Sequence, residues 1–182
     1  MRSLFPASRS ATSLVTISAV AIVALAASAA TVAPLAAQSV GLPIGTVAPA
    51  AQVQTLDGKP ADLKQYIGKT PVVFEFWATW CPNCAELEPT MHALSAKYGD
   101  KVKLVGVAVS VNQSPARVKA FAEKHKLPLE VVWDHDGNAT DVYLAPATSY
   151  VVIVDKAGKV VYTGLGGKQD LDAAVAKALK GE

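Results

Sequence analysis

Three short apolar runs in the middle of the chain predict buried β-strands. Residues 72–77 (VVFEFW) form a β-branched and aromatic run, and residues 102–109 and 129–133 have a similar character. Glu75 is the only charged residue within the first run. Because segments of helix length separate these runs, the pattern is typical of an α/β domain.

Apolar residues at helical spacing predict the helices that follow the strands. Residues 81–98 carry such a face, interrupted by Pro89, which is expected to kink the helix. Residues 114–126 begin with a serine and a proline, the N-cap and first-turn residues of a second helix. A third amphipathic helix is predicted for residues 170–179, at the end of the chain.

Turn signals predict two hairpins around this core. A weakly alternating run at residues 52–56 precedes the pair Asp57-Gly58, which is typical of hairpin turns. Residues 150–154 and 159–163 are predicted strands joined by a short polar turn. The order of elements predicts an α/β fold with a central mixed β-sheet, helices on both of its faces, and an N-terminal β-hairpin extension.

The first 37 residues predict a targeting segment. Two arginines precede an uncharged run over residues 14–37 that is rich in alanine, valine, isoleucine and leucine, the order found in a secretory signal. The run is also long enough to remain as a membrane anchor. We therefore assign residues 1–37 to a signal peptide or N-terminal membrane anchor and residues 38–182 to the folded domain, outside the inner membrane in both cases.

The formal net charge of +2 comes from that segment. Arg2 and Arg9 are the only charged residues before Asp57, and residues 38–182 hold 15 basic and 15 acidic side chains. A nucleic-acid-binding domain requires a clustered basic face. We therefore expect no nucleic-acid partner, and membrane contact only if the N-terminal segment is retained.

The two cysteines of the chain carry its most specific chemical signal. Cys81 and Cys84 form the motif Cys-Pro-Asn-Cys between a buried strand and a helix. A purely structural bridge of this spacing encloses two residues and constrains the unfolded chain little. A zinc site needs about four ligands, and a haem attachment site needs a histidine where Ala85 stands. A reversible dithiol–disulfide couple remains, with no metal or cofactor expected.

Position along the helix predicts different roles for the two sulfurs. Cys81 lies at the helix N-terminus, where free NH groups and the helix dipole favour a thiolate, so it is the expected nucleophile. Cys84 lies one turn further on and is expected to be more buried and to resolve the mixed disulfide. Pro82 starts the helix without losing a needed NH group.

Glu75 and two tryptophans accompany the motif. A carboxylate in an apolar strand is costly to bury in its charged form, so the pKa of Glu75 should rise and the group can exchange protons with Cys84. The alternative is a strand-end glutamate that reaches solvent. Trp80 is expected to shield the dithiol or to contact a partner, whereas Trp77 is expected in the core; core packing alone is the alternative for both.

Residues 74–84 (FEFWATWCPNC) resemble the active-site stretch of the thioredoxin superfamily, and their surroundings resemble its exported TlpA/ResA-type branch. The likeness covers most of residues 43–180 and includes the segment 45–49, the hairpin at 56–59, and Pro89 five residues after the second cysteine. It implies a thioredoxin-like fold and thiol-disulfide exchange with protein substrates. It also places Glu75 at the position of the family's buried acidic residue.

The resemblance further implies the protein's setting and partners. We expect protein disulfide or dithiol substrates, an upstream membrane electron donor, a monomer, and a location in the periplasm or another extracytoplasmic space. Several members keep exported cysteines reduced for cytochrome c maturation, whereas others serve different clients.

One position departs from the family pattern. The family places a cis-proline beside the dithiol, commonly six residues before the aspartate of the last hairpin, and that count from Asp155 gives Ser149. Either Pro146 still approaches the sulfurs through a lengthened loop, or Thr148 and Ser149 take the place. We predict that Thr148 or Ser149 lies within van der Waals reach of Cys81, and that Trp80, Pro82, Thr148 and Ser149 contact the substrate.

Two other functions fit parts of the pattern. A peroxidase of the peroxiredoxin type shares the fold, but its nucleophile usually follows a threonine by three residues, where Ala78 stands here. A copper-binding module would use the two thiolates with Met91 or His92 on the same helix. Residues 134–137 (DHDG) suggest a metal site only weakly, since an Asx-type turn explains them better.

Overall fold

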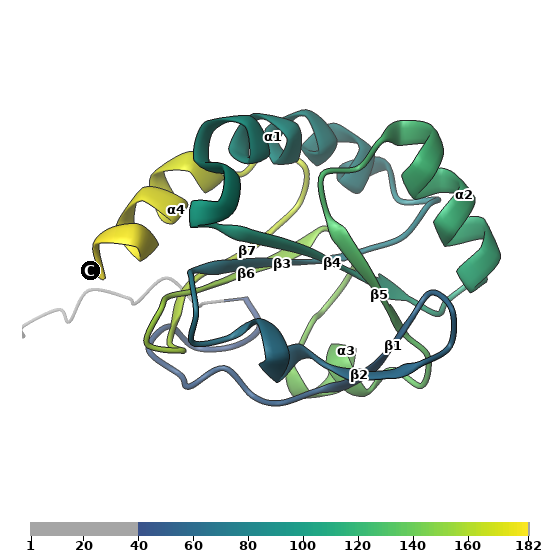
Figure 1. The fold of residues 1–182 in the computed structure, drawn as a ribbon, viewed down its shortest axis with the longest axis horizontal. Coiled ribbons are helices and arrows are strands. Elements are labelled where there is room, and N and C mark those ends of the chain that lie inside the picture. The colour runs from purple at the N-terminus through teal and green to yellow at the C-terminus, as the bar shows by residue number, and fades with distance from the viewer. Residues whose placement is uncertain (1–39, 182) are drawn as a thin grey trace, which may run out of the picture. The chain divides into compact units, whose positions relative to one another are not determined.

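A seven-stranded mixed sheet organises the domain, shown in Figure 1 and described for residues 40–181 in a computed structural model. The three central strands are parallel to one another, and the strands on either side pair antiparallel to them. This confirms the α/β fold, the mixed sheet and the N-terminal hairpin. In sheet order the strands are β2 (Pro60–Asp62), β1 (Gln52–Thr55), β5 (Glu130–Asp134), β4 (Lys103–Val109), β3 (Val72–Trp77), β6 (Tyr150–Val154) and β7 (Val160–Leu165).

The long helices lie on one face of this sheet. Figure 1 shows α1 (Pro82–Tyr98), α2 (Pro115–His125) and α4 (Leu171–Lys180) above the strands. The short helix α3 (Asn138–Val142) lies below them, and the 3-10 helix η1 (Leu63–Tyr66) packs into the core on that same side. Helical structure therefore covers both faces, as predicted, although the face below carries only short elements. A second 3-10 helix, η2 (Gly99–Lys101), links α1 to β4.

Alternation along β3 divides its side chains between the two faces. Phe74 and Phe76 join the core below the sheet, whereas Val73 and Trp77 pack against the long helices. Glu75 therefore lies on the face covered by α1 and α2, because successive side chains of a strand point in opposite directions. Phe74 and Phe76 therefore face away from Glu75.

Helix α3 has no counterpart among the predicted elements. Its first turn is held by the fully buried Asp134, whose carboxylate accepts hydrogen bonds from the NH groups of Ala139 and Thr140 at 3.0 and 2.9 Å. Before it, Asp136 accepts a hydrogen bond of 3.1 Å from the NH group of Asn138, which is the predicted Asx-type turn. The polar segment therefore supports a local turn and helix start.

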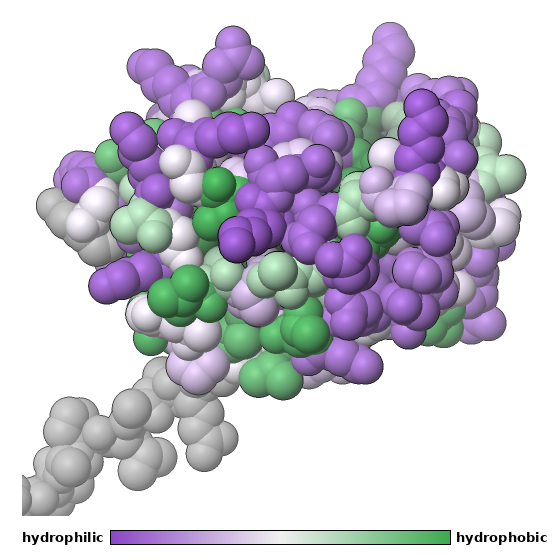
Figure 2. Space-filling view, turned by 60° about the horizontal axis from the view of Figure 1, so that its bottom comes forward, coloured by the Kyte–Doolittle hydropathy of each residue, from purple (hydrophilic) through white to green (hydrophobic). Residues whose placement is uncertain are grey.

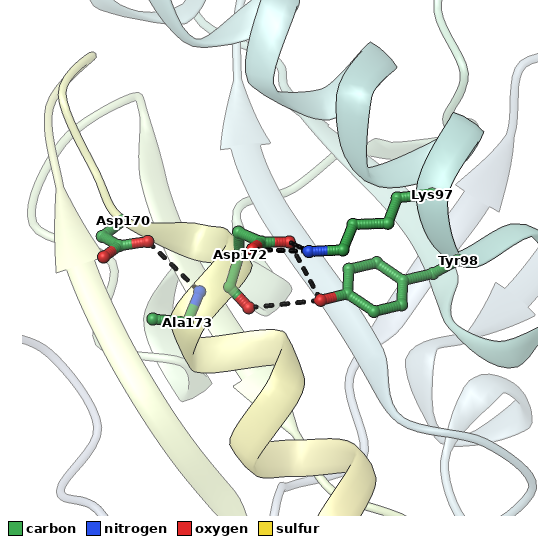
Figure 3. Close-up of polar contacts among 5 residues, drawn as sticks. All are labelled: Lys97, Tyr98, Asp170, Asp172 and Ala173. Carbon is green, nitrogen blue, oxygen red and sulfur yellow. Dashed lines mark hydrogen bonds and ion pairs between the residues drawn. The ribbon is translucent and has the colours of Figure 1, made fainter.

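Polar contacts fix α4 against α1, as Figure 3 shows. The ammonium group of Lys97 lies 2.7 Å from both carboxylate oxygens of Asp172, and the Tyr98 hydroxyl donates to the same carboxylate at 2.9 Å. Asp170 caps α4 by accepting a hydrogen bond from the NH group of Ala173. These contacts orient the two helices that border the apolar core above β3 and β6.

Apolar side chains form separate groups on the face of the domain shown in Figure 2. Figure 2 shows these groups separated by hydrophilic residues on the side of the domain that it brings forward. Among the described residues, the exposed large apolar side chains include Ile44, Val47, Trp80 and Leu144. No helix within residues 40–181 has the length and apolar character required to cross a membrane. The predicted leader at residues 1–37 lies outside the described residues.

Candidate functional site

The two cysteines lie where β3 passes into α1. Cys81 is the N-cap residue of α1, and Cys84 lies within its first turn. Their sulfurs form a disulfide, with the two Cα atoms 5.3 Å apart. Pro82 occupies the first helical position, where its missing NH group costs no helical hydrogen bond. The predicted arrangement at the start of a helix is confirmed.

The sulfur of Cys81 takes part in capping the helix. It accepts a hydrogen bond of 3.1 Å from the NH group of Cys84. An NH donor and the positive end of a helix dipole both favour negative charge on that sulfur. The geometry therefore suits Cys81 as the cysteine that reacts as a thiolate.

Burial does not distinguish the two cysteines in this oxidised form. Cys81 is 5% exposed and Cys84 is 7% exposed. The expectation that Cys84 would be more buried is wrong, because both cysteines pack in one apolar cluster with Trp77, Ala78 and Val118, while Pro82 and Asn83 between them are exposed. Their different positions, at the N-cap of α1 for Cys81 and in its first turn for Cys84, distinguish their roles instead.

A cavity that is partly open to solvent lies beside the disulfide. It has a volume of about 140 Å³ and lies between α1, α2 and the sheet. Both cysteines border it, together with polar and aromatic side chains of the two helices and β3. The residues that matter for chemistry are Glu75, Trp77, Cys84, Glu88, Met91 and His125.

Glu75 supplies a buried acid to this cavity. Glu75 is 4% exposed. It lies within β3, where it pairs in the sheet with Gly106 of β4 and Val151 of β6. Burial, and after it the neighbouring negative charge of Glu88, together raise the pKa of Glu75 from 4.5 to about 8. The alternative of a strand-end glutamate reaching solvent is excluded. A carboxyl group with this pKa can both accept and donate a proton near neutral pH.

The two tryptophans occupy different environments. Trp77 is 3% exposed and stacks at a tilt on Phe121, with ring centroids 5.7 Å apart. Trp80 is 41% exposed, and its indole NH donates to the carbonyl oxygen of Val111 at 2.8 Å. Core packing therefore describes Trp77, whereas Trp80 presents an exposed ring beside the dithiol.

Hydrogen bonds from the chain after β4 hold the loop that carries Trp80. The amide oxygen of Gln113 accepts from the NH group of Thr79 at 2.9 Å, and its amide nitrogen donates to Val109 at 2.6 Å. Together with the Trp80 bond to Val111, these contacts fix the approach to Cys81. A second cavity of about 460 Å³ borders Trp80, Pro146 and Thr148.

Ser149 takes a backbone conformation that proline cannot adopt. Its φ is +65°, its NH group donates to the carbonyl oxygen of Phe76 at 2.7 Å, and its hydroxyl donates to Gly166 at 3.0 Å. Proline has a φ near −65° and no NH group. Ser149 is fully buried, and Pro146 and Thr148 border the second cavity. The predicted approach of Thr148 or Ser149 to Cys81 stays a prediction.

Sequence reasoning missed two ionisable residues of the site. Glu88 of α1 and His125 of α2 both border the cavity, with His125 Nδ1 3.2 and 3.3 Å from the two Glu88 carboxylate oxygens. Glu88 follows Cys84 by four residues, a spacing that places both on one side of a helix. That signal was available in the sequence, whereas the position of His125 depends on how α2 packs.

Among the described residues, no group of three or more histidine, cysteine, aspartate or glutamate side chains could hold a metal ion. Met91 is buried and borders the cavity, but the neighbouring His92 is directed to Glu88, with 3.9 Å between Nε2 and the carboxylate. The two residues of the copper hypothesis therefore have different surroundings.

Comparison with known proteins gives consistent matches. Residues 44–163 match the AhpC/TSA family. The thioredoxin-like protein YneN of Bacillus subtilis is 32% identical over 139 residues, which cover 74% of this chain and 80% of that protein. The thiol-disulfide oxidoreductase ResA of Bacillus thuringiensis is 33% identical over 118 residues, 65% of this chain and 67% of ResA.

A solved structure supports the same relationship. The crystal structure of a secreted Mycobacterium tuberculosis disulfide oxidoreductase, homologous to Escherichia coli DsbE, matches with a TM-score of 0.59 and 28% identity. The match covers 69% of this chain and 93% of that protein. The predicted thioredoxin-like fold is confirmed by these likenesses and by the observed sheet.

Proposed function

The chain belongs to the AhpC/TSA family of thioredoxin-like proteins and resembles its thiol-disulfide oxidoreductases, and we propose that it reduces disulfides in proteins outside the cytoplasm. The observation that carries this proposal is the Cys81–Cys84 disulfide at the N-terminus of α1, which borders the same cavity as the buried acid Glu75. Such a site combines an activated nucleophile, a resolving thiol and a proton acceptor.

The reaction begins with the reduced form of the pair. The Cys81 thiolate attacks one sulfur of the substrate disulfide, forms a mixed disulfide, and releases the other substrate sulfur as a thiolate. Cys84 then loses its proton to the Glu75 carboxylate and attacks the Cys81 sulfur. The Cys81–Cys84 bond forms, the bond to the substrate breaks, and two electrons have passed to the substrate.

The remaining site residues are proposed to receive the substrate. Trp80 is exposed beside Cys81, Pro82 is exposed at the start of α1, and Thr148 shares the second cavity with Trp80. Ser149 supports this edge through its bonds to Phe76 and Gly166. A protein segment bound against Trp80 and Thr148 would bring its disulfide to the end of α1.

The proposed location is the periplasm or another extracytoplasmic space. The signal-like character of residues 1–37 supports export, and the related Mycobacterium tuberculosis protein is described as secreted. Outside the cytoplasm, the disulfide formed in each cycle must be reduced again, so a membrane electron donor is part of the proposal. Cytochrome c maturation is one process that needs such a reductant, and the protein is proposed to act as a monomer.

The reduction potential of the Cys81–Cys84 pair tests the direction of electron flow. We expect a value near that of thioredoxin, about −270 mV, measured on the full-length protein in redox buffers. A value near that of the oxidant DsbA, about −120 mV, would contradict a reductase. Reduction of insulin disulfides supplies the matching activity measurement, with the Cys81→Ser variant as the inactive control.

The family assignment raises peroxide reduction as a second candidate. In that reaction the Cys81 thiolate attacks a hydroperoxide, the O–O bond breaks, and a sulfenic acid forms as the alcohol, or water from hydrogen peroxide, is released; Cys84 then condenses with the sulfenic acid to give the disulfide and water. Consumption of hydrogen peroxide far faster than by a free thiol, with no reduction of insulin, would favour this candidate. The Cys-Pro-Asn-Cys ring at a helix start favours disulfide exchange.

A further inference from the structure

We propose that Glu88 and His125 form a carboxylate–imidazole pair that carries protons between Glu75 and the solvent during each cycle. The inference rests on the proposed function, because it concerns the step in which Cys84 loses its proton. It assigns positioning and proton-transfer roles to two residues that do not touch the reacting sulfurs in the proposed mechanism.

The three groups form a path of increasing exposure. Glu75 is 4% exposed, the side chain of Glu88 is 21% exposed, and that of His125 is 33% exposed. All three border the same cavity, and His125 Nδ1 lies 3.2 and 3.3 Å from the Glu88 oxygens. A proton on Glu75 therefore has a chain of acceptors that leads outward between α1 and α2.

Aromatic stacking fixes the orientation of the imidazole. The His125 ring lies parallel to Phe121, with centroids 3.9 Å apart and planes inclined by 11°, and Phe121 in turn contacts Trp77. His125 is also the last residue of α2, where the helix dipole favours a cation. The ring is therefore held with Nδ1 toward Glu88 and can carry a positive charge while a proton passes.

The cavity between the carboxyl groups can accommodate water. Its volume of about 140 Å³ exceeds what a single water molecule requires. Trp77 borders the cavity, and its indole NH is buried without a hydrogen-bond partner among the described residues. A water that accepts from this NH group would link Glu75 to Glu88.

Few ionisable side chains share the surroundings of Glu75. Its neighbours on β4 and β6, Gly106 and Val151, carry none. From α1 the ionisable groups at the cavity are the two cysteines and Glu88, and from α2 the group is His125. His92 also lies 3.9 Å from Glu88 but does not border the cavity. It therefore offers a matched control for His125.

One proton moves along this path in each catalytic cycle. When the Cys84 thiol loses its proton and attacks Cys81, the proton goes to the Glu75 carboxylate and must leave before the next cycle. Glu88 receives it from Glu75 through the cavity and passes it to His125, which releases it to solvent. Reduction of the Cys81–Cys84 disulfide by the electron donor returns a proton along the same path.

The first experiment measures buffer dependence of the resolving step. His125→Ala and His92→Ala variants of the full-length protein are reduced, mixed with a small disulfide, and followed by tryptophan fluorescence at neutral pH. We expect about a tenfold slower resolving step in His125→Ala at low buffer concentration, less than the hundredfold or more of a direct acid–base group. Added imidazole should restore the rate, and His92→Ala should match the wild type.

The second experiment measures the coupling of the two carboxyl groups without turnover. In the oxidised protein the cysteines do not titrate, so carboxyl-carbon NMR reports the pKa of Glu75 directly. We expect Glu88→Gln to lower that pKa, because the negative charge of Glu88 raises it in the wild type. His92→Ala should leave it unchanged.

The outcomes separate this inference from the proposed function. A wild type that reduces disulfides, with a His125→Ala rate that is normal or not restored by imidazole, overturns the proton path alone. Equal losses in His92→Ala and His125→Ala overturn the route through His125. A wild type that fails to reduce disulfides overturns the proposed function, while the Glu75 titration still decides whether Glu88 is coupled to it.

Discussion

The NH group of Cys84 donates a hydrogen bond of 3.1 Å to the sulfur of Cys81, so the residue that is expected to resolve the mixed disulfide also stabilises its nucleophile. The bond exists because Cys81 is the N-cap residue of α1 and Cys84 lies three residues later. This spacing is the one at which an N-cap side chain meets a free NH group. Two cysteines separated by two residues therefore suit a helix start.

Substitution of each cysteine should have a different effect. Cys81→Ser is expected to abolish exchange, because the nucleophile is lost. Cys84→Ser should retain the first attack and accumulate mixed disulfides, because no thiol remains to resolve them. Mass spectrometry of the variants after incubation with a disulfide substrate measures both results. Stable adducts on Cys81→Ser through Cys84 would reverse the assigned roles.

Glu75 should make the folded protein less stable as pH rises. Its pKa is about 8 in the folded state against an ordinary value of 4.5, so the unfolded chain releases the proton first. The contribution of Glu75 to the free energy of unfolding should therefore be highest below pH 4.5 and fall between pH 4.5 and 8, by up to about 1.4 kcal/mol per pH unit. Above that range the decline should end.

The Glu75→Gln variant tests this origin. It should lack the decline and exceed the wild type in stability at pH 8, as measured by urea unfolding of the oxidised proteins across this range. Glu86→Gln is the matched control, because Glu86 lies on the exposed side of α1. If the stabilities of the wild type and Glu75→Gln changed with pH in the same way, the buried carboxyl group of Glu75 would not be the cause of the decline.

Ser149 should tolerate glycine but not proline. Ser149→Pro cannot reach a φ of +65° and loses the NH bond to Phe76, so we expect a loss of about 3 kcal/mol or more. Ser149→Gly adopts this backbone without strain and loses only the hydroxyl bond to Gly166, about 1 kcal/mol. Chemical unfolding of both variants measures the difference. A stable Ser149→Pro would show that the family's proline fits this backbone.

Gly106 should be sensitive to a single methyl group. A Cβ atom at this position would lie 2.7 Å from Trp77 Nε1 and 3.1 Å from a methyl carbon of Leu129, so Gly106→Ala forces the indole to move. We expect a loss of about 1–3 kcal/mol in unfolding free energy. A double-mutant cycle with Trp77→Phe provides the control, since removal of the indole nitrogen should recover part of the loss. If the effects of Gly106→Ala and Trp77→Phe on stability were additive, the contact between position 106 and the indole would not be the source of the strain.

Much of the fold could be predicted because its signals are local. The run at residues 72–77 and the turn at Asp57-Gly58 each specify an element through neighbouring residues, and the observed β3 and β1–β2 hairpin agree with them. Helix α3 was missed because five residues cannot display a helical period. Its start depends on Asp134, whose buried carboxylate accepts hydrogen bonds from residues five and six positions later.

The sequence by itself determined the dithiol and its acid. Cys81, Cys84 and Glu75 lie on one strand and the first turn of one helix, so chain connectivity and local geometry alone bring them together. Only the tertiary structure decided that His125 meets Glu88, because the two residues lie 37 positions apart on separate helices. It also decided that Ser149 takes a left-handed backbone, since that conformation follows from bonds to Phe76 and Gly166. Contacts between distant segments depend on how whole helices and strands pack, which no local pattern specifies.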